Sequence, residues 1–233
     1  MIILKKWDDL PADIKTQEVR PYWEILKKKQ GQLALKRGFD FFVSGILLLF
    51  LAIPMLIISV LIKLDSPGPV FYRQERVTSY GKPFKIHKFR TMVVNADKIG
   101  TLVTVDHDPR ITRIGAFLRK YRLDELPQAL DVFCGDMSFV GTRPEATKYV
   151  KQYTPEMRAT LLLPAGVTSE ASIRYKDEAL LLDKAEDADV VYVEKILPEK
   201  MKYNLDSIKH FSLISDLRTM VRTVLAVLGK EYN

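Results

Sequence analysis

A run of apolar residues with a proline in its middle constrains this chain more than any other feature. The run "LLLFLAIPMLIISVLIK" covers residues 47–63, and residues 41–62 contain no charged side chain. About 20 such residues suffice for a helix to cross the hydrocarbon core of a bilayer. The run starts too far from Met1, and is too long, to be the apolar part of a cleavable signal peptide. We therefore expect a helix that enters a membrane.

Basic residues flank this run on both sides, and they bear on its orientation. They are Lys27, Lys28, Lys29, Lys36 and Arg37 before it, and Lys63, Arg73, Arg76, Lys82 and Lys85 after it. Because basic residues favour the cytoplasmic side of a membrane, both flanks favour the same side. A helix broken at Pro54 could enter one leaflet and return, since proline removes a backbone donor and clashes with the preceding turn. A kinked single span is the alternative, and charge and proline leave the two open.

The charge balance points to a polyanionic partner. The 233 residues carry a formal net charge of +7, and the pI is near 9.3. Nucleic acid, anionic lipid and a phosphorylated substrate would all suit this excess. No nucleic-acid-reading module is found in the sequence, so nucleic acid is not expected. The single cysteine, Cys134, excludes an intramolecular disulfide and fits a reducing compartment.

The rest of the chain predicts a small β-hairpin and several amphipathic helices. Residues 70–72 and 84–86 resemble strands around a glycine-containing loop. Residues 110–122 place apolar side chains at helical spacing, with basic residues on or near the other face and no acid. Such a helix suits an anionic membrane surface, although packing on the core with a solvated basic face also explains it. The apolar stripe in residues 213–228 is either core or interfacial.

We therefore predict a helix-rich α+β fold. Residues 1–33 are mainly polar and are expected to form an extension outside the main fold. Residues 34–63 would form the membrane helix, whether re-entrant or spanning. Residues 64–233 would form a single domain.

The candidate chemistry lies in the carboxylate pair Asp124-Glu125. Acids in the first turn of a helix are ordinarily caps. Here the sequence surrounds them with basic residues, namely Lys88, Arg90, Arg119, Lys120, Arg122 and Arg143. Such cations would lower the pKa of the pair and could hold a diphosphate. A carboxylate can attack phosphorus, and Mg²⁺ commonly bridges a carboxylate and substrate phosphates.

Several motifs in order carry a family resemblance. They are "FKIHKFRTM" (residues 84–92), "DPRITRIGAFLRKYRLDELPQALDVFCGDMSFVGTRPE" (residues 108–145) and "LPAGVT" (residues 163–168). From about Lys36 to the C-terminus the chain resembles the bacterial monotopic phosphoglycosyl transferases, also called sugar transferases.

The resemblance implies a reaction and its partners. A sugar 1-phosphate would pass from a nucleotide diphosphate sugar, usually a UDP-sugar, to undecaprenyl phosphate at the cytoplasmic face of the bacterial inner membrane. This is the first membrane step of surface glycan synthesis. Asp124 would attack the β-phosphate, expel UMP and carry a covalent phosphosugar. Glu125 would assist by positioning or by proton handling, and Mg²⁺, with Asp124 as a ligand, would neutralise the diphosphate. A homodimer stays open.

The resemblance also assigns supporting residues. Lys88 in "KFRTM" and Arg143 in "RP" match basic positions around the phosphate site, and Arg174 matches more loosely. The apolar run would be a re-entrant helix in contact with membrane lipid. Three departures are Ile53-Pro54 in place of Ser-Pro, Thr142 in place of a proline, and Cys134 in a run that differs from the usual one.

One other class of function remains open. A membrane-anchored binding or scaffolding protein without catalysis would use Asp124 and Glu125 only as caps. The sequence does not reveal which sugar is carried; residues 165–189 are expected to decide it. The acidic residues 177–189 are expected to be a solvated loop or helix face.

Overall fold

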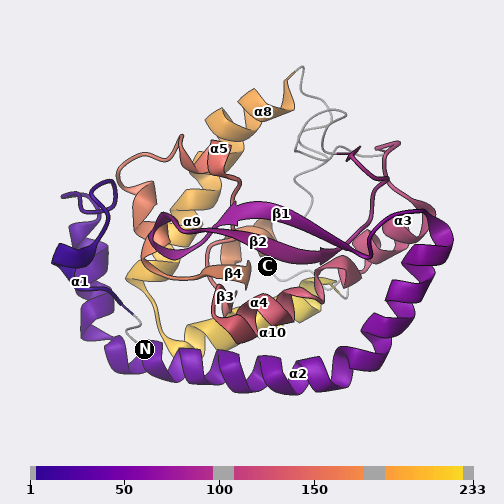
Figure 1. Ribbon diagram of the computed structural model, residues 1–233. Helices are drawn as coiled ribbons and strands as arrows, with labels where there is room; N and C mark the ends of the chain where they lie inside the picture. Colours follow the sequence, from indigo (N-terminus) through magenta and orange to yellow (C-terminus); the bar gives the residue numbers. More distant parts are fainter. Residues whose placement is uncertain (1–3, 97–107, 176–186, 228–233) are drawn as a thin grey trace.

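The computed structural model describes residues 4–96, 108–175 and 187–227, and it confirms a helix-rich α+β fold (Figure 1). The helices are α1 (Arg20–Lys28), α2 (Gln30–Asp65), α3 (Arg113–Lys120), α4 (Gln128–Cys134), α5 (Thr147–Val150), α6 (Glu170–Arg174), α8 (Ala188–Val191), α9 (Leu197–Lys209) and α10 (Leu213–Val227). The strands are β1 (Phe71–Val77), β2 (Pro83–Phe89), β3 (Met137–Val140) and β4 (Ala165–Thr168). Short 3₁₀ turns are η1 (Trp7–Asp9), η2 (Ser79–Gly81), η4 (Leu123–Glu125) and η5 (Met157–Leu162), and the π-helical turn η6 (Tyr192–Ile196) precedes α9.

Helix α2 contains the apolar run and is the one helix among the described residues that is long and apolar enough to cross a membrane. It continues through Pro54 rather than ending there, and Figure 1 shows it bending toward α3. Its apolar side chains remain widely exposed, namely Leu35, Phe41, Phe42, Ile46, Leu49, Phe50, Ile53, Leu56, Ile57, Val60, Leu61 and Leu64. An exposed apolar surface of this extent marks a site of interaction with a membrane or with another protein.

Both ends of α2 are fastened to the same body of the protein. Near its start, the Arg37 guanidinium donates to the carbonyls of Val132 and Phe133, each at 2.8 Å. At its end, the Asp65 carboxylate accepts from the backbone N–H of Ile114 in α3 at 3.0 Å. Ile62 is buried against β2 and α3 in a small apolar cluster. A helix held in this way does not carry its two ends to separate domains.

The predicted hairpin is present as the antiparallel pair β1 and β2. Along β1 the side chains alternate between exposed and half-buried, as expected for a strand with one face covered. Tyr72 lies opposite Lys88, and Gln74 lies opposite Ile86. These side chains therefore share one face of the hairpin.

A second, parallel pair is formed by β3 and β4. Its backbones approach so closely that a methyl group on Gly166 would lie 2.2 Å from the backbone N and O of Gly141. Gly141 N donates to Thr168 O, and Gly166 N donates to Thr142 O. Because only glycine fits there, the chain after β3 is held against β4 and reaches Arg143 in a fixed position.

Helix α3 is fixed just as closely to the end of β2. Thr112 caps it by accepting from Gly115 N at 3.0 Å. A methyl group on Gly115 would lie 2.0 Å from the carbonyl oxygen of Thr91. Leu118 is buried beneath the helix, whereas Phe117 and Tyr121 are exposed. Helix α10 likewise exposes Ile214, Leu217, Val221, Val224 and Val227.

The N-terminal segment does not lie outside the fold, and that expectation is wrong. Its apolar side chains belong to the largest buried cluster, together with those of α9: Leu4, Leu10, Ile14, Val19, Tyr22, Trp23, Leu26 and Leu33. Tyr22 OH also donates to Glu156 Oε1 at 2.6 Å. The segment is polar on average, but its few apolar residues converge on one face and are buried there.

We predict that Arg90 stabilises the exit of α2. Its guanidinium donates to Pro67 O at 2.5 Å and to Ser66 O at 2.8 Å. Arg90→Met should lower the Tm of the protein in nanodiscs by roughly 5 °C, because two carbonyls lose a charged donor. The control is Lys82→Met, which removes a surface ion pair with Asp136 and should change Tm by less than about 2 °C. An unchanged Tm for Arg90→Met would contradict this structural role.

Candidate active site

The carboxylate pair lies on η4, a single 3₁₀ turn between α3 and α4. Arg122, directly before it, has a left-handed backbone with φ of 56°. Such a conformation in a residue other than glycine costs on the order of 1–3 kcal/mol and persists only where the surrounding structure enforces it. The turn at Arg122 redirects the chain after α3, so that Asp124 and Glu125 both reach the same cavity.

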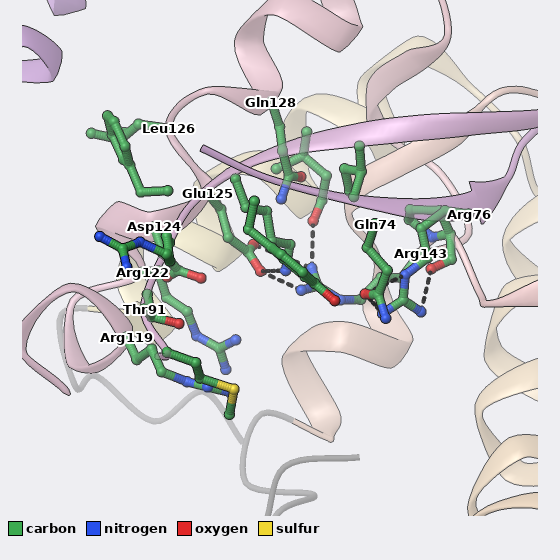
Figure 2. Close-up of a pocket in the computed structure, with 18 of the residues that line it drawn as sticks. Gln74, Arg76, Thr91, Arg119, Arg122, Asp124, Glu125, Leu126, Gln128 and Arg143 are labelled. Atoms are coloured by element: carbon green, nitrogen blue, oxygen red, sulfur yellow. Dashed lines mark hydrogen bonds and ion pairs between the residues drawn. The ribbon is translucent and has the colours of Figure 1, made fainter. Parts of the chain in front are cut away.

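Glu125 is the point at which three separate segments meet. Its Oε1 accepts from Lys88 Nζ of β2 at 3.0 Å. The Arg143 guanidinium donates to both of its oxygens, with Nη1 to Oε2 at 3.2 Å and Nη2 to Oε1. Arg143 Nη1 also donates to Val167 O in β4 at 3.3 Å. Figure 2 shows these contacts as dashed lines on one side of the cavity.

Asp124 is placed differently from its neighbour. Within the part of the chain that the structure describes, no side chain forms a hydrogen bond or ion pair with its carboxylate. Burial raises the pKa of Asp124; Lys88 lowers it, Glu125 raises it further, and the net shift is upward from 3.8. For Glu125, burial also acts to raise the pKa, but Arg143 and Lys88 outweigh it and hold the pKa well below 4.5. The two adjacent carboxylates are thus shifted in opposite directions.

The cavity around the pair has a volume of about 1430 Å³ and is strongly basic. Ten of its lining side chains are Lys or Arg and four are Asp or Glu. A cleft lined by one sign of charge concentrates ligands of the opposite sign. Its size and charge suit a phosphorylated ligand of nucleotide dimensions.

The structure brings together four of the residues that the sequence predicts: Asp124, Glu125, Lys88 and Arg143. The other two make different contacts. Arg90 borders the cavity, but it directs two of its nitrogens to the α2 exit. Arg174 lies outside the cavity lining, with its guanidinium 4.8 Å from the ring centroid of Tyr203.

Other cavity residues were not predicted from the sequence. Gln74 and Arg76 of β1 line the wall beside Arg143, and Gln128 lines it from α4 (Figure 2). A sequence signal exists for the first two, because they alternate with exposed residues along a strand whose other positions face solvent. Of the acidic residues 177–189, residues 177–186 lie outside the described structure.

A divalent cation fits this site only if the substrate supplies most of its ligands. In residues 4–96, 108–175 and 187–227 there is no group of three or more His, Cys, Asp or Glu side chains that could hold a metal ion. Mg²⁺ is often held by one or two carboxylates together with substrate phosphates and water. Asp124, which has no ion pair in the described structure, could supply that single carboxylate.

We predict that the Glu125 carboxylate stabilises the fold. Glu125→Gln should lower Tm at pH 7 by roughly 5–10 °C, because Lys88 and Arg143 lose their shared counter-charge. The pKa of Glu125 is lowered by folding, so its contribution is present above pH 4.5 and is lost as pH falls below that value. The difference in Tm between wild type and variant should therefore shrink in acid.

The control for this comparison is Asp136→Asn, which removes the partner of the exposed Lys82. It should change the free energy of unfolding by less than about 1 kcal/mol. An equal Tm for wild type and Glu125→Gln at pH 7 would show that the ion pairs contribute nothing.

Comparison with known proteins gives the family. Residues 31–230 match the family model described as "Bacterial sugar transferase". The chain is 38% identical over 209 residues to the "Exopolysaccharide production protein PSS" of Rhizobium leguminosarum bv. phaseoli, a match that covers 85% of this chain and 97% of that one.

Two relatives carry names that state a reaction. The "UDP-glucose:undecaprenyl-phosphate glucose-1-phosphate transferase" of Escherichia coli (strain K12) is 36% identical over 195 residues, covering 82% of this chain and 39% of that protein. The "UDP-N-acetylgalactosamine-undecaprenyl-phosphate N-acetylgalactosaminephosphotransferase" of Aeromonas hydrophila is 35% identical over 197 residues, covering 83% and 44%. The chain spans less than half the length of these two. It belongs to the bacterial sugar transferase family.

Proposed function

We propose that the protein transfers a sugar 1-phosphate from a UDP-sugar to undecaprenyl phosphate through a covalent intermediate on Asp124, with release of UMP. The observation that carries this proposal is the contrast within the pair. Glu125 is committed to Lys88 and Arg143, whereas Asp124 faces the same basic cavity with no ion pair in the described structure. One carboxylate holds the cations in place, and the other is available to react.

In the first step, an Asp124 carboxylate oxygen attacks the β-phosphorus of the UDP-sugar. A phosphorus–oxygen bond forms to Asp124, and the bond from that phosphorus to the bridging oxygen breaks. UMP leaves with the bonding electron pair as a phosphate anion. Lys88 and Arg143 lie beside the reacting centre and would stabilise the charge that develops on the phosphoryl oxygens.

In the second step, a phosphate oxygen of the lipid attacks the same phosphorus and displaces the Asp124 carboxylate. The product is a polyprenyl diphosphate sugar, and the enzyme returns to its starting form. Before the first step, the Asp124 carboxylate could help to hold Mg²⁺, which would supply positive charge to neutralise the diphosphate. Glu125 keeps the two cations oriented through both steps.

The membrane arrangement follows from α2. Its exposed apolar face would lie in the bilayer, and both of its ends return to one domain through Arg37 and Asp65. This supports a re-entrant helix over a single span. With basic flanks on both sides, we place the domain on the cytoplasmic face of the inner membrane.

We predict that Asp124→Asn abolishes turnover. With the protein in nanodiscs, Mg²⁺, undecaprenyl phosphate and either UDP-glucose or UDP-N-acetylgalactosamine, UMP release should fall at least about 10³-fold. The Tm should not fall, because folding already disfavours the charged form of Asp124. Asp136→Asn serves as the matched control. Undiminished UMP release from Asp124→Asn would exclude the covalent role, and a wild type without release from any donor would favour a membrane-anchored scaffold.

We also predict the direction of the pH dependence. The nucleophile must be ionised, and the pKa of Asp124 is raised above its usual value of 3.8. On acidification, kcat/KM should therefore begin to fall at a pH above 3.8. In Glu125→Gln this acid limb should move to lower pH, because a like charge is removed and two cations are freed to favour ionised Asp124. Tm measured at each pH separates this titration from unfolding. An acid limb that stays in place in the variant would contradict the assignment.

A further inference from the structure

The side chain of Gln128 is buried and has no hydrogen-bond partner among the described residues. Gln128 opens α4 and is only 1% exposed. Within residues 4–96, 108–175 and 187–227, neither its Nε2 nor its Oε1 has a partner. Buried polar side chains are nearly always paired, since an unpaired amide costs free energy in the folded state. The presence of a buried amide with no hydrogen-bond partner therefore needs an explanation.

Its position supplies one. Gln128 lines the basic cavity three residues after Glu125 in the sequence. Figure 2 shows its side chain directed toward the place where Glu125 meets Arg143. Lys88, whose ammonium also binds Glu125, lines the same cavity. The amide of Gln128 is thus a neutral group beside the charged Glu125, Arg143 and Lys88.

The fold itself makes no use of this amide. Gln128 forms no side-chain cap on α4, and the preceding Pro127 has no N–H to be capped. Asn204 of α9 provides a contrast: it is similarly buried, lies outside the cavity lining, and its Nδ2 contacts Met201 Sδ at 3.8 Å. A buried apolar side chain of similar length would therefore serve the unliganded protein better than Gln128 does.

We infer that Gln128 is a substrate-binding residue for the donor, an inference that rests on the proposed function. Its Nε2 donates to a non-bridging oxygen of the diphosphate, and its Oε1 accepts from a hydroxyl of the transferred sugar. The ligand thereby supplies both missing partners at once. Because both amide atoms are closed to solvent in the free protein, the side chain turns about its own rotatable bonds as the donor enters.

The test combines stability with kinetics, because the inference predicts opposite effects on the two. Gln128→Met keeps the length of the side chain and removes both polar atoms. Its Tm without ligand should equal or exceed that of wild type by up to about 4 °C. Its kcat/KM for UMP release should fall on the order of 10- to 100-fold, the value of a hydrogen bond to a charged group. The increase in Tm that UDP produces in wild type should also diminish.

Two further variants sharpen the comparison. Gln128→Glu should lose more activity than Gln128→Met, because its carboxylate repels the diphosphate. Asn204→Leu, a buried amide removed away from the cavity, should leave kcat/KM unchanged.

Each other outcome overturns the inference. If Gln128→Met keeps kcat/KM within twofold while wild type releases UMP, the role of Gln128 fails and the proposed function stands. If Gln128→Met loses activity together with several degrees of Tm, the amide is structural and the inference fails. If wild type releases no UMP from any UDP-sugar, the inference and the proposed function fail together.

Discussion

The shared ion pair at Glu125 is the interaction on which the rest of the site depends. One carboxylate joins β2 through Lys88 to the segment after β3 through Arg143. The two cations are 55 positions apart in the sequence, so chain connectivity does not bring them together. Buried charges persist only when they are paired, so the three segments position one another. Asp124 then stands beside two cations whose places are already fixed.

The second constraint is that such a site would have to work at the boundary between water and the lipid bilayer. A UDP-sugar is dissolved in water, whereas a polyprenyl phosphate is held at the bilayer surface. In the proposed function, the exposed apolar faces of α2 and α10 would contact lipid, and the basic cavity would contact phosphate. A protein that joins these two surfaces in one body brings its two substrates to one place.

The sequence predicts which residues meet in the cavity better than it predicts the packing. The ordered motifs identify Asp124, Glu125, Lys88 and Arg143, and the structure brings these four together. Lys88 and Arg90 should share a face if the strand continued, but β2 ends at Phe89 and Arg90 turns to the α2 exit. Gln128 is beyond sequence reasoning, because a missing hydrogen-bond partner has no signature in the chain. The N-terminal segment is misjudged because average polarity conceals a few converging apolar residues.

The contact between Gly115 and Thr91 has a mechanical consequence. It packs α3, which carries the exposed Phe117, tightly against Thr91, two residues after the end of the strand that carries Lys88. Close-packed interfaces transmit displacement rather than absorb it. A displacement of α3 would therefore be transmitted to Thr91 and, along the chain, toward Lys88. In the proposed function, a change in the membrane surface beneath α3 would reach the chain three residues from Lys88.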